Sequence, residues 1–165
     1  VMPMLSRVFR TDFKVGLNAF LARCGDRTAM RSMRAIVDHN EAHGSVAIPF
    51  GQDLLLAAEA TAGDWSEPGY HLDRARDIRL TRAEGIDRVL AQHALDAIVV
   101  PMDHASKFTG KSGYPAVSVP CGYTGEGEPI GITFVGRAWS EPRLIGIAHA
   151  FEQATRARRP PALAA

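Results

Sequence analysis

Residues 105–112 contain the side chains whose types and spacing come nearest to a nucleotide site. They end in Gly-Lys-Ser after a candidate strand, as a phosphate-binding loop does, with Ala105 in place of the first glycine. Such a loop needs a helix that starts at the lysine and serine, so that its amide groups point at the phosphates. Pro115 follows closely and is incompatible with a regular helix there. We therefore interpret 105–112 as a flexible surface or active-site loop and keep a nucleotide-binding module as an alternative.

Serines next to lysines offer a second chemistry, because a neutral lysine can activate a serine nucleophile. The sequence has three lysines, Lys14, Lys107 and Lys111, and the last two each adjoin a serine. Adjacent residues in an extended chain point to opposite faces, so neither pair forms the required hydrogen bond simply. The sequence also has no Gly-x-Ser-x-Gly nucleophile elbow. We expect no complete catalytic constellation, and no catalytic residue, within this chain.

Metal chemistry is also poorly supported. His39 and His43 lie four residues apart on a predicted helix, but Glu41 stands one residue too late for a zinc-protease motif, and no third ligand is evident. Cys24 and Cys121 lie far apart and form no Cys-x-x-Cys pair. The histidines predict a polar helix end, and we expect neither a metal nor another cofactor.

Composition limits the function further. The 165 residues are 46% hydrophobic and 22% charged, with a net charge of +1, which indicates an ordinary globular chain without a nucleic-acid surface. No apolar run approaches the ~20 residues of a membrane span, so no membrane partner is expected. Two isolated cysteines favour a reducing compartment, and we expect a cytoplasmic protein.

The elements that must position these residues change in type along the chain. Residues 10–93 carry helical patterns, such as the apolar spacing of Phe13, Leu17, Phe20 and Leu21. A second helix is predicted to end before Gly44, a good residue to end a helix. Further helices are expected over 53–60 and 68–93.

Residues 95–136 bear the predicted strands, and a final helix is expected over 141–156. Three continuous apolar runs, 97–100, 116–119 and 130–135, are typical of strands buried on both faces. We predict an α/β segment, 1–165, that completes a sheet whose other strands lie elsewhere. Exposed strand edges make a homodimer a further expectation.

Several stretches, in this order, resemble one family. They are 12–14, 17–21, 40–43, 50–55, 95–101, 113–120, 131–136 and 151–155. Together these stretches resemble the C-terminal part of the amidase-signature family of amide hydrolases. The resemblance covers about residues 10 to 160, and the order and spacing of the stretches are more specific than any single one.

The resemblance implies a fold and an activity. The family's fold is an α/β/α sandwich around a mixed sheet, and its Ser-Ser-Lys catalytic region lies in an earlier part that this chain does not match. A whole enzyme would hydrolyse a small-molecule amide at its C–N bond through an acyl-enzyme, without metal. This chain would supply part of the sheet and one wall of the pocket, and would be inactive alone.

The resemblance also places the stretch after Pro101 at a strand end that faces the substrate pocket. The pocket residues it implies are Met102, Asp103, His104 and Ser106. Many members have Pro-Thr where this chain has Pro101-Met102, and an ordinary solvated loop is the alternative for Asp103 and His104. A non-enzymatic interaction module, pairing with another chain, is the alternative for the whole segment.

Overall fold

A computed structural model describes residues 6–161, which group into two compact units. The first ends at Arg76 and the second begins at Asp77. Helix α4 (Pro68–Thr81) contributes residues to both units. None of the helices in the described range is long and apolar enough to cross a membrane.

The first unit is helical, as the sequence predicts for this half. Its elements are α1 (Val8–Cys24), η1 (Gly25–Arg27), α2 (Met33–His43), η2 (Gly44–Val46) and α3 (Asp53–Glu59). Helix α1 packs against α2 and α3, and its fully buried position is Thr11, with Leu21 also buried. The predicted apolar face behaves differently, because Phe13 and Phe20 are exposed.

Helix α2 shows why this sequence forms a helix here. The Ser32 hydroxyl accepts a hydrogen bond from the Ala35 amide at 3.1 Å and caps the first turn, an arrangement worth about 1 kcal/mol. Met33 and Val37, one turn apart, are fully buried. Gly44 ends the helix at φ 53°, a conformation that favours glycine, as predicted.

Lys14 joins α1 to the end of α3. Its Nζ donates to the carbonyl oxygens of Glu59 at 2.6 Å and Thr61 at 2.9 Å, and lies 3.5 Å from the Glu59 carboxylate. The last carbonyls of a helix lack partners within the helix, so a cation there is favourable. This lysine is therefore engaged in holding two helices together.

The long helix predicted over 68–93 is interrupted by one π-helical turn. Helix α4 passes into η3 (Arg82–Ile86) and then α5 (Asp87–Gln92). At Gly85 a β-carbon would lie 2.5 Å from the Leu80 carbonyl oxygen. Glycine therefore permits the close backbone approach that this turn requires.

The second unit contains an antiparallel sheet of three strands in the order β1-β3-β2. The strands are β1 (Ile98–Pro101), β2 (Ala116–Tyr123) and β3 (Pro129–Val135). The register pairs Val99 of β1 and Val117 of β2 with Phe134 of β3. The predicted three strands with flanking helices are confirmed.

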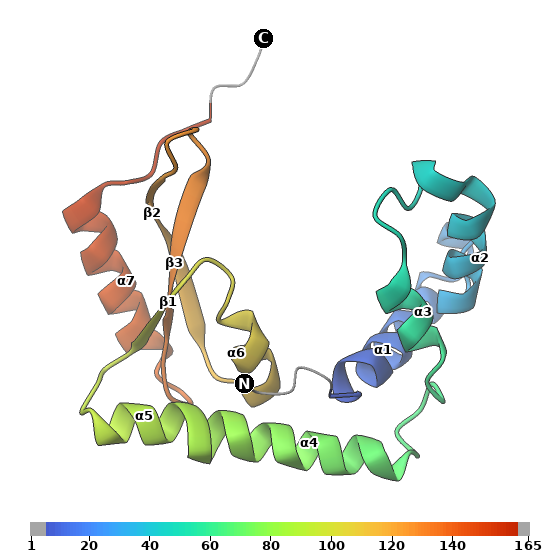
Figure 1. Cartoon of the computed structure of the whole chain (residues 1–165), viewed down its shortest axis with the longest axis horizontal. Coiled ribbons are helices and arrows are strands. Elements are labelled where there is room, and N and C mark those ends of the chain that lie inside the picture. Colours follow the sequence, from blue (N-terminus) through green and yellow to red (C-terminus); the bar gives the residue numbers. More distant parts are fainter. Residues whose placement is uncertain (1–5, 162–165) are drawn as a thin grey trace. The chain divides into compact units, whose positions relative to one another are not determined.

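Helices cover both faces of this sheet, so the unit has three layers (Figure 1). On one face, α7 (Glu141–Thr155) buries Leu144 and Ala148 against Phe134. On the other face, Leu90 of α5 packs with Val135. This is the α/β/α layering that the resemblance implies.

Strand burial is less complete than the apolar runs predict. Val99 is 52% exposed on the α7 face of β1, and Ser118 is exposed on the opposite face of β2. Val135 at the end of central β3 is fully buried. The prediction of burial on both faces therefore holds at the end of β3, where Thr133, Phe134 and Val135 are buried, and fails in the outer strands.

The expectation of a loop over 105–112 is wrong. Residues Ser106–Ser112 form helix α6, which ends at Gly113 with φ 69°. Ala105 and Phe108 anchor it to the core beside Leu90. Pro115 lies beyond this end, so it does not interfere with the helix.

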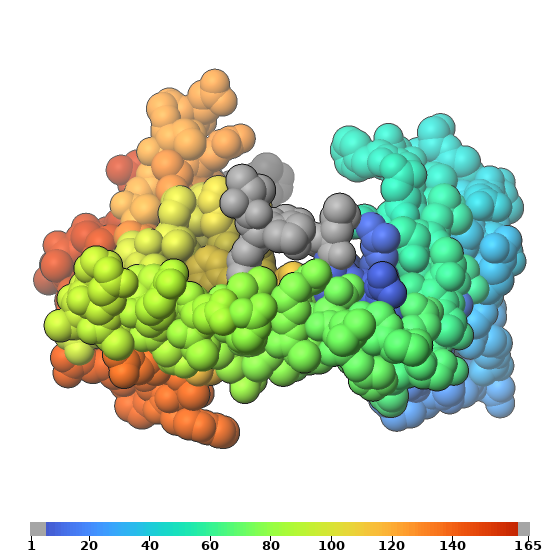
Figure 2. Space-filling model, turned by 60° about the horizontal axis from the view of Figure 1, so that its bottom comes forward, coloured from blue at the N-terminus to red at the C-terminus, as the bar shows by residue number. Residues whose placement is uncertain are grey.

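The two ends of the sheet are distinct in the second unit. Figure 2 shows the β2–β3 hairpin in light orange and the segment after β3 in darker orange, at opposite ends of this unit. Pro101 pairs with Ile132 towards the hairpin end, whereas Ile98 pairs with Val135 at the other end. Residues that follow β1 and residues that follow β3 therefore occupy different ends.

Candidate functional site

A tight turn follows β1, where sequence reasoning expects the pocket wall. Met102 has φ 52°, an uncommon value for a residue with a side chain. Its amide donates to the Gly131 carbonyl at 2.9 Å, and the His104 amide donates to the Pro101 carbonyl at 3.4 Å. These bonds hold the chain in a fixed reversal at the end of the strand.

Two hydroxyl groups from neighbouring strands support this turn. Thr133, 3% exposed, donates from Oγ1 to the Met102 carbonyl at 2.6 Å. Its Oγ1 lies 2.7 Å from Ser118 Oγ. Because the single hydroxyl hydrogen of Thr133 is directed to Met102, Ser118 is the donor in the second bond. The resulting chain of hydrogen bonds runs from β2 through β3 to the turn.

The structure brings the four predicted pocket residues together on this one turn. Met102 is 46% exposed, and Asp103, His104 and Ser106 are exposed as well. The Ser106 amide donates to the Asp103 carbonyl at 2.9 Å and starts α6. Buried Ala105 ties the turn to the core, so the exposed side chains stand on a fixed backbone.

The geometry at the end of α6 is unlike that of a phosphate-binding loop. Lys111 and Ser112 lie in the last turn of the helix, whereas a phosphate site uses amides of the first turn. Lys111 Nζ donates to Asp77 Oδ1 at 3.0 Å. The fully buried Ser112 hydroxyl donates to the Thr109 carbonyl at 3.2 Å and accepts from the Tyr114 amide at 3.1 Å.

The two histidines on α2 contact each other. The rings of His39 and His43 lie 4.0 Å apart between centroids, and His43 Nδ1 lies 2.7 Å from the His39 carbonyl oxygen. Within residues 6–161, no three side chains of histidine, cysteine, aspartate or glutamate are grouped to hold a metal ion.

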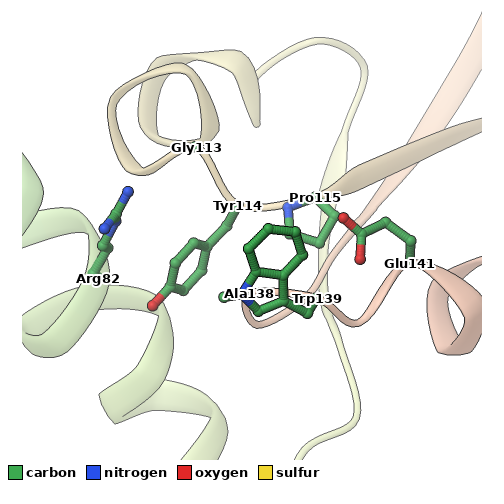
Figure 3. Close-up of a pocket in the computed structure, with 7 residues that line it drawn as sticks. All are labelled: Arg82, Gly113, Tyr114, Pro115, Ala138, Trp139 and Glu141. Atoms are coloured by element: carbon green, nitrogen blue, oxygen red, sulfur yellow. The ribbon is translucent and has the colours of Figure 1, made fainter.

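A pocket that sequence reasoning missed lies at the other end of the sheet (Figure 3). It has a volume of about 200 Å³ and is lined by Arg82, Gly113, Tyr114, Pro115, Ala138, Trp139 and Glu141. Ligand pockets typically measure about 300–1,000 Å³, so this one is small for a drug-sized ligand. Trp139 is 89% exposed and has φ 64°.

Arg82 and Tyr114, which line that pocket, are held by hydrogen bonds and by contact with each other. Arg82 Nε donates to the Ser112 carbonyl at 2.7 Å, and its guanidinium lies 5.6 Å from the Tyr114 ring centroid. The Tyr114 hydroxyl donates to Asp87 Oδ2 at 2.7 Å. Burial of the phenol, then its bond to Asp87, raises the pKa of Tyr114.

This pocket could not have been found from one stretch of sequence, because its residues come from η3, from the segment between α6 and β2, and from the segment that leads from β3 into α7. The only local signal is a tryptophan just before the predicted final helix. Of the three lysines, Lys14 donates to carbonyl oxygens and Lys111 donates to the Asp77 carboxylate.

Comparisons with known proteins agree with this fold. No family model matches the sequence. A probable amidase of Arabidopsis thaliana is 38% identical over 152 residues, which are 91% of this chain and 29% of that protein. A glutamyl-tRNA(Gln) amidotransferase component of Synechococcus is 41% identical over 78 residues, which are 46% of this chain and 14% of that protein.

Solved amidase structures are also similar to nearly the whole of this chain. The native peptide amidase of Stenotrophomonas maltophilia superposes with a TM-score of 0.78 at 39% identity, over 95% of this chain and 34% of that one. An amidase family protein of Bacillus anthracis superposes with a TM-score of 0.78 at 27% identity, over 93% of this chain and 30% of that one.

The layered sheet, the fixed turn after β1 and these relatives define a part of an amide-hydrolase fold. Over most of its length the chain is similar to the C-terminal part of amidase-signature family proteins. The match covers nearly all of this chain but only about a third of the length of the solved relatives.

Proposed function

We propose that this chain supplies part of the sheet and one wall of the substrate pocket to an amide hydrolase that acts on C–N bonds of small-molecule amides. In this proposal the serine nucleophile and its lysine belong to the rest of the amidase fold. The chain by itself does not hydrolyse amides. The observation that carries the proposal is the near-complete match of this chain to a third of a peptide amidase.

The turn of residues 102–106 is the proposed pocket wall. Its backbone is held by Thr133 and Gly131, while Met102, Asp103 and His104 stand exposed. A pocket wall needs a fixed backbone that presents exposed side chains to the substrate, because positioning a substrate requires groups held in place before binding. The turn satisfies both requirements without a catalytic group of its own.

Reconstitution tests this proposal. The chain is co-expressed with a version of the Stenotrophomonas maltophilia peptide amidase from which the matching third has been removed. We expect amide hydrolysis by the pair and by the intact peptide amidase, but not by either part alone. A pair that stays inactive while the intact enzyme works would contradict the proposal.

A non-enzymatic interaction module is the second candidate. Among the described residues, β1 and β2 each pair only with β3, so each has one edge without a strand. Such edges favour pairing with another chain, including a second copy. Sedimentation of the purified chain distinguishes the two proposals, since a stable homodimer would favour this module and a monomer would not.

We also propose a cytoplasmic location and a chain that binds no nucleic acid. Cys24 and Cys121 are both free thiols, which suits a reducing compartment. The net charge of +1 offers no excess of cations for a phosphate backbone. Fractionation of the source cells and a salt-dependent DNA-binding titration test these two points.

A further inference from the structure

The pocket beside Trp139 is lined by two side chains of opposite charge. Figure 3 shows Arg82 on one side of this pocket and Glu141 on the other, with the rings of Tyr114 and Trp139 between them. Within residues 6–161, neither Arg82 nor Glu141 forms an ion pair. Specificity in a small pocket comes from a few placed polar groups of this kind, so a ligand can engage both charges.

The positive group is held in place before any ligand binds. Arg82 is half-buried, its Nε donates to the Ser112 carbonyl at 2.7 Å, and its guanidinium lies 5.6 Å from the Tyr114 ring centroid. Tyr114 is fixed in turn, because its hydroxyl donates to Asp87 and its amide donates to the Ser112 hydroxyl. The donors on the two terminal nitrogens of Arg82 remain for a ligand, and such an edge binds a carboxylate through two parallel hydrogen bonds.

Trp139 combines an unfavourable backbone with little burial. Its φ of 64° is costly for a bulky residue, and the residue is 89% exposed. The turn is fixed by Ser140, whose amide and hydroxyl donate to the Arg137 carbonyl at 3.3 Å and 2.8 Å. Strained backbone of this kind is concentrated at ligand sites. The indole offers a flat apolar surface, and its face attracts ammonium groups.

We propose that this pocket binds a small zwitterion whose carboxylate pairs with Arg82 and whose ammonium group pairs with Glu141 beside the Trp139 ring. The volume of about 200 Å³ suits a metabolite rather than a drug-sized ligand. Because the two charged groups lie on opposite sides of the pocket, a ligand with charges at its two ends, such as an ω-amino acid or a dipeptide, fits better than an α-amino acid. The pocket and the turn of residues 102–106 lie at opposite ends of the sheet, so this inference does not rest on the proposed function.

Calorimetric titration of the purified 165-residue chain tests the inference with three probes of equal carbon-chain length. 5-Aminopentanoate carries both charges, pentanoate lacks the ammonium group, and pentylamine lacks the carboxylate. We expect 5-aminopentanoate to bind with a Kd on the order of 1 mM or lower, and each of the other two probes to bind at least about tenfold more weakly.

A pair of variants assigns the binding to this pocket. Glu141→Gln removes the negative charge from an exposed position, so it should weaken 5-aminopentanoate at least about tenfold and leave pentanoate unchanged. Glu126→Gln is the matched control, because it removes the same charge from the exposed loop between β2 and β3, and it should leave the affinity for every probe unchanged. Circular dichroism checks that both variants fold.

Three outcomes would overturn the inference. An absence of saturable binding by 5-aminopentanoate would show that the pocket takes no such ligand. Equal affinities for 5-aminopentanoate and pentanoate would make it an anion site without recognition of the ammonium group. Equal losses in Glu141→Gln and Glu126→Gln would reduce the binding to an effect of net charge.

Discussion

The Thr133 hydroxyl donates to the Met102 carbonyl at 2.6 Å and thereby joins the central strand to the turn that we propose as the pocket wall. Met102 holds a positive φ at this point, so the bond stabilises a backbone conformation that is otherwise unfavourable. The proposed wall consequently depends on a buried side chain of the central strand.

Replacement of Thr133 by valine removes this hydrogen bond while keeping the shape of the side chain. We expect the free energy of unfolding to fall by about 1–3 kcal/mol, since a part-buried carbonyl loses its donor. Urea unfolding measures the loss, and hydrogen exchange should be faster at the His104 and Ser106 amides. Thr133→Ser keeps the hydroxyl and should restore slow exchange; equal exchange in both variants would contradict this account.

Gly85→Ala is expected to destabilise the second unit by about 1–3 kcal/mol, because the new β-carbon would lie 2.5 Å from the Leu80 carbonyl oxygen. Gly110→Ala in α6 is the matched control, since nothing lies within 4 Å of its β-carbon position. That variant should be unchanged or more stable by up to about 1 kcal/mol. Thermal melts of the two proteins compare them directly, and equal melting temperatures would argue against a strained π-turn.

Lys111 and Asp77 form an ion pair in which Asp77 is only 4% exposed and its Oδ2 has no hydrogen-bond partner. Lys111→Met leaves this carboxylate buried beside an apolar side chain, so we expect a loss of about 3 kcal/mol or less. The double variant Lys111→Met, Asp77→Leu removes the buried charge as well and should be more stable than the single variant. Denaturant titrations would refute this if the double variant proved the weaker of the two.

Tyr114 should make stability depend on alkaline pH. Burial and the Asp87 bond raise its folded pKa above the ordinary value of 10, so the folded state holds the phenol proton more tightly than the unfolded chain does. This contribution is fully present below about pH 10 and is lost as pH rises through the folded pKa. Tyr114→Phe should flatten the fall in unfolding free energy above this pH, although Tyr70, whose pKa is also raised, leaves part of it. An unchanged slope would contradict the prediction.

The sequence predicts the order of elements well because periodicity and capping act locally. Gly44 ends α2, as the sequence predicts, and Met33 and Val37 lie buried one turn apart on that helix. Helix α6 escapes prediction because Pro115 suggests a break, whereas Ala105 and Phe108 hold the helix in a core whose other members are distant in sequence.

The exposure of side chains is predicted less well than helix formation, because it too depends on contacts with residues distant in sequence. Phe13 and Phe20 have the spacing of a core face, but α2 and α3 pack against the side of α1 that carries Thr11 and Leu21. Which face of a helix is covered depends on its neighbours, and local spacing does not specify them. The pocket beside Trp139 escapes prediction because three separate segments build it.

The central claim is that this chain is a supporting part of an amide hydrolase and carries no catalytic machinery of its own. The most direct test is an amide-hydrolysis assay on the purified 165-residue chain, with intact peptide amidase as the positive control. The account predicts no turnover above the buffer background. Turnover that disappears when Ser106 or Lys107 is replaced by alanine would contradict it.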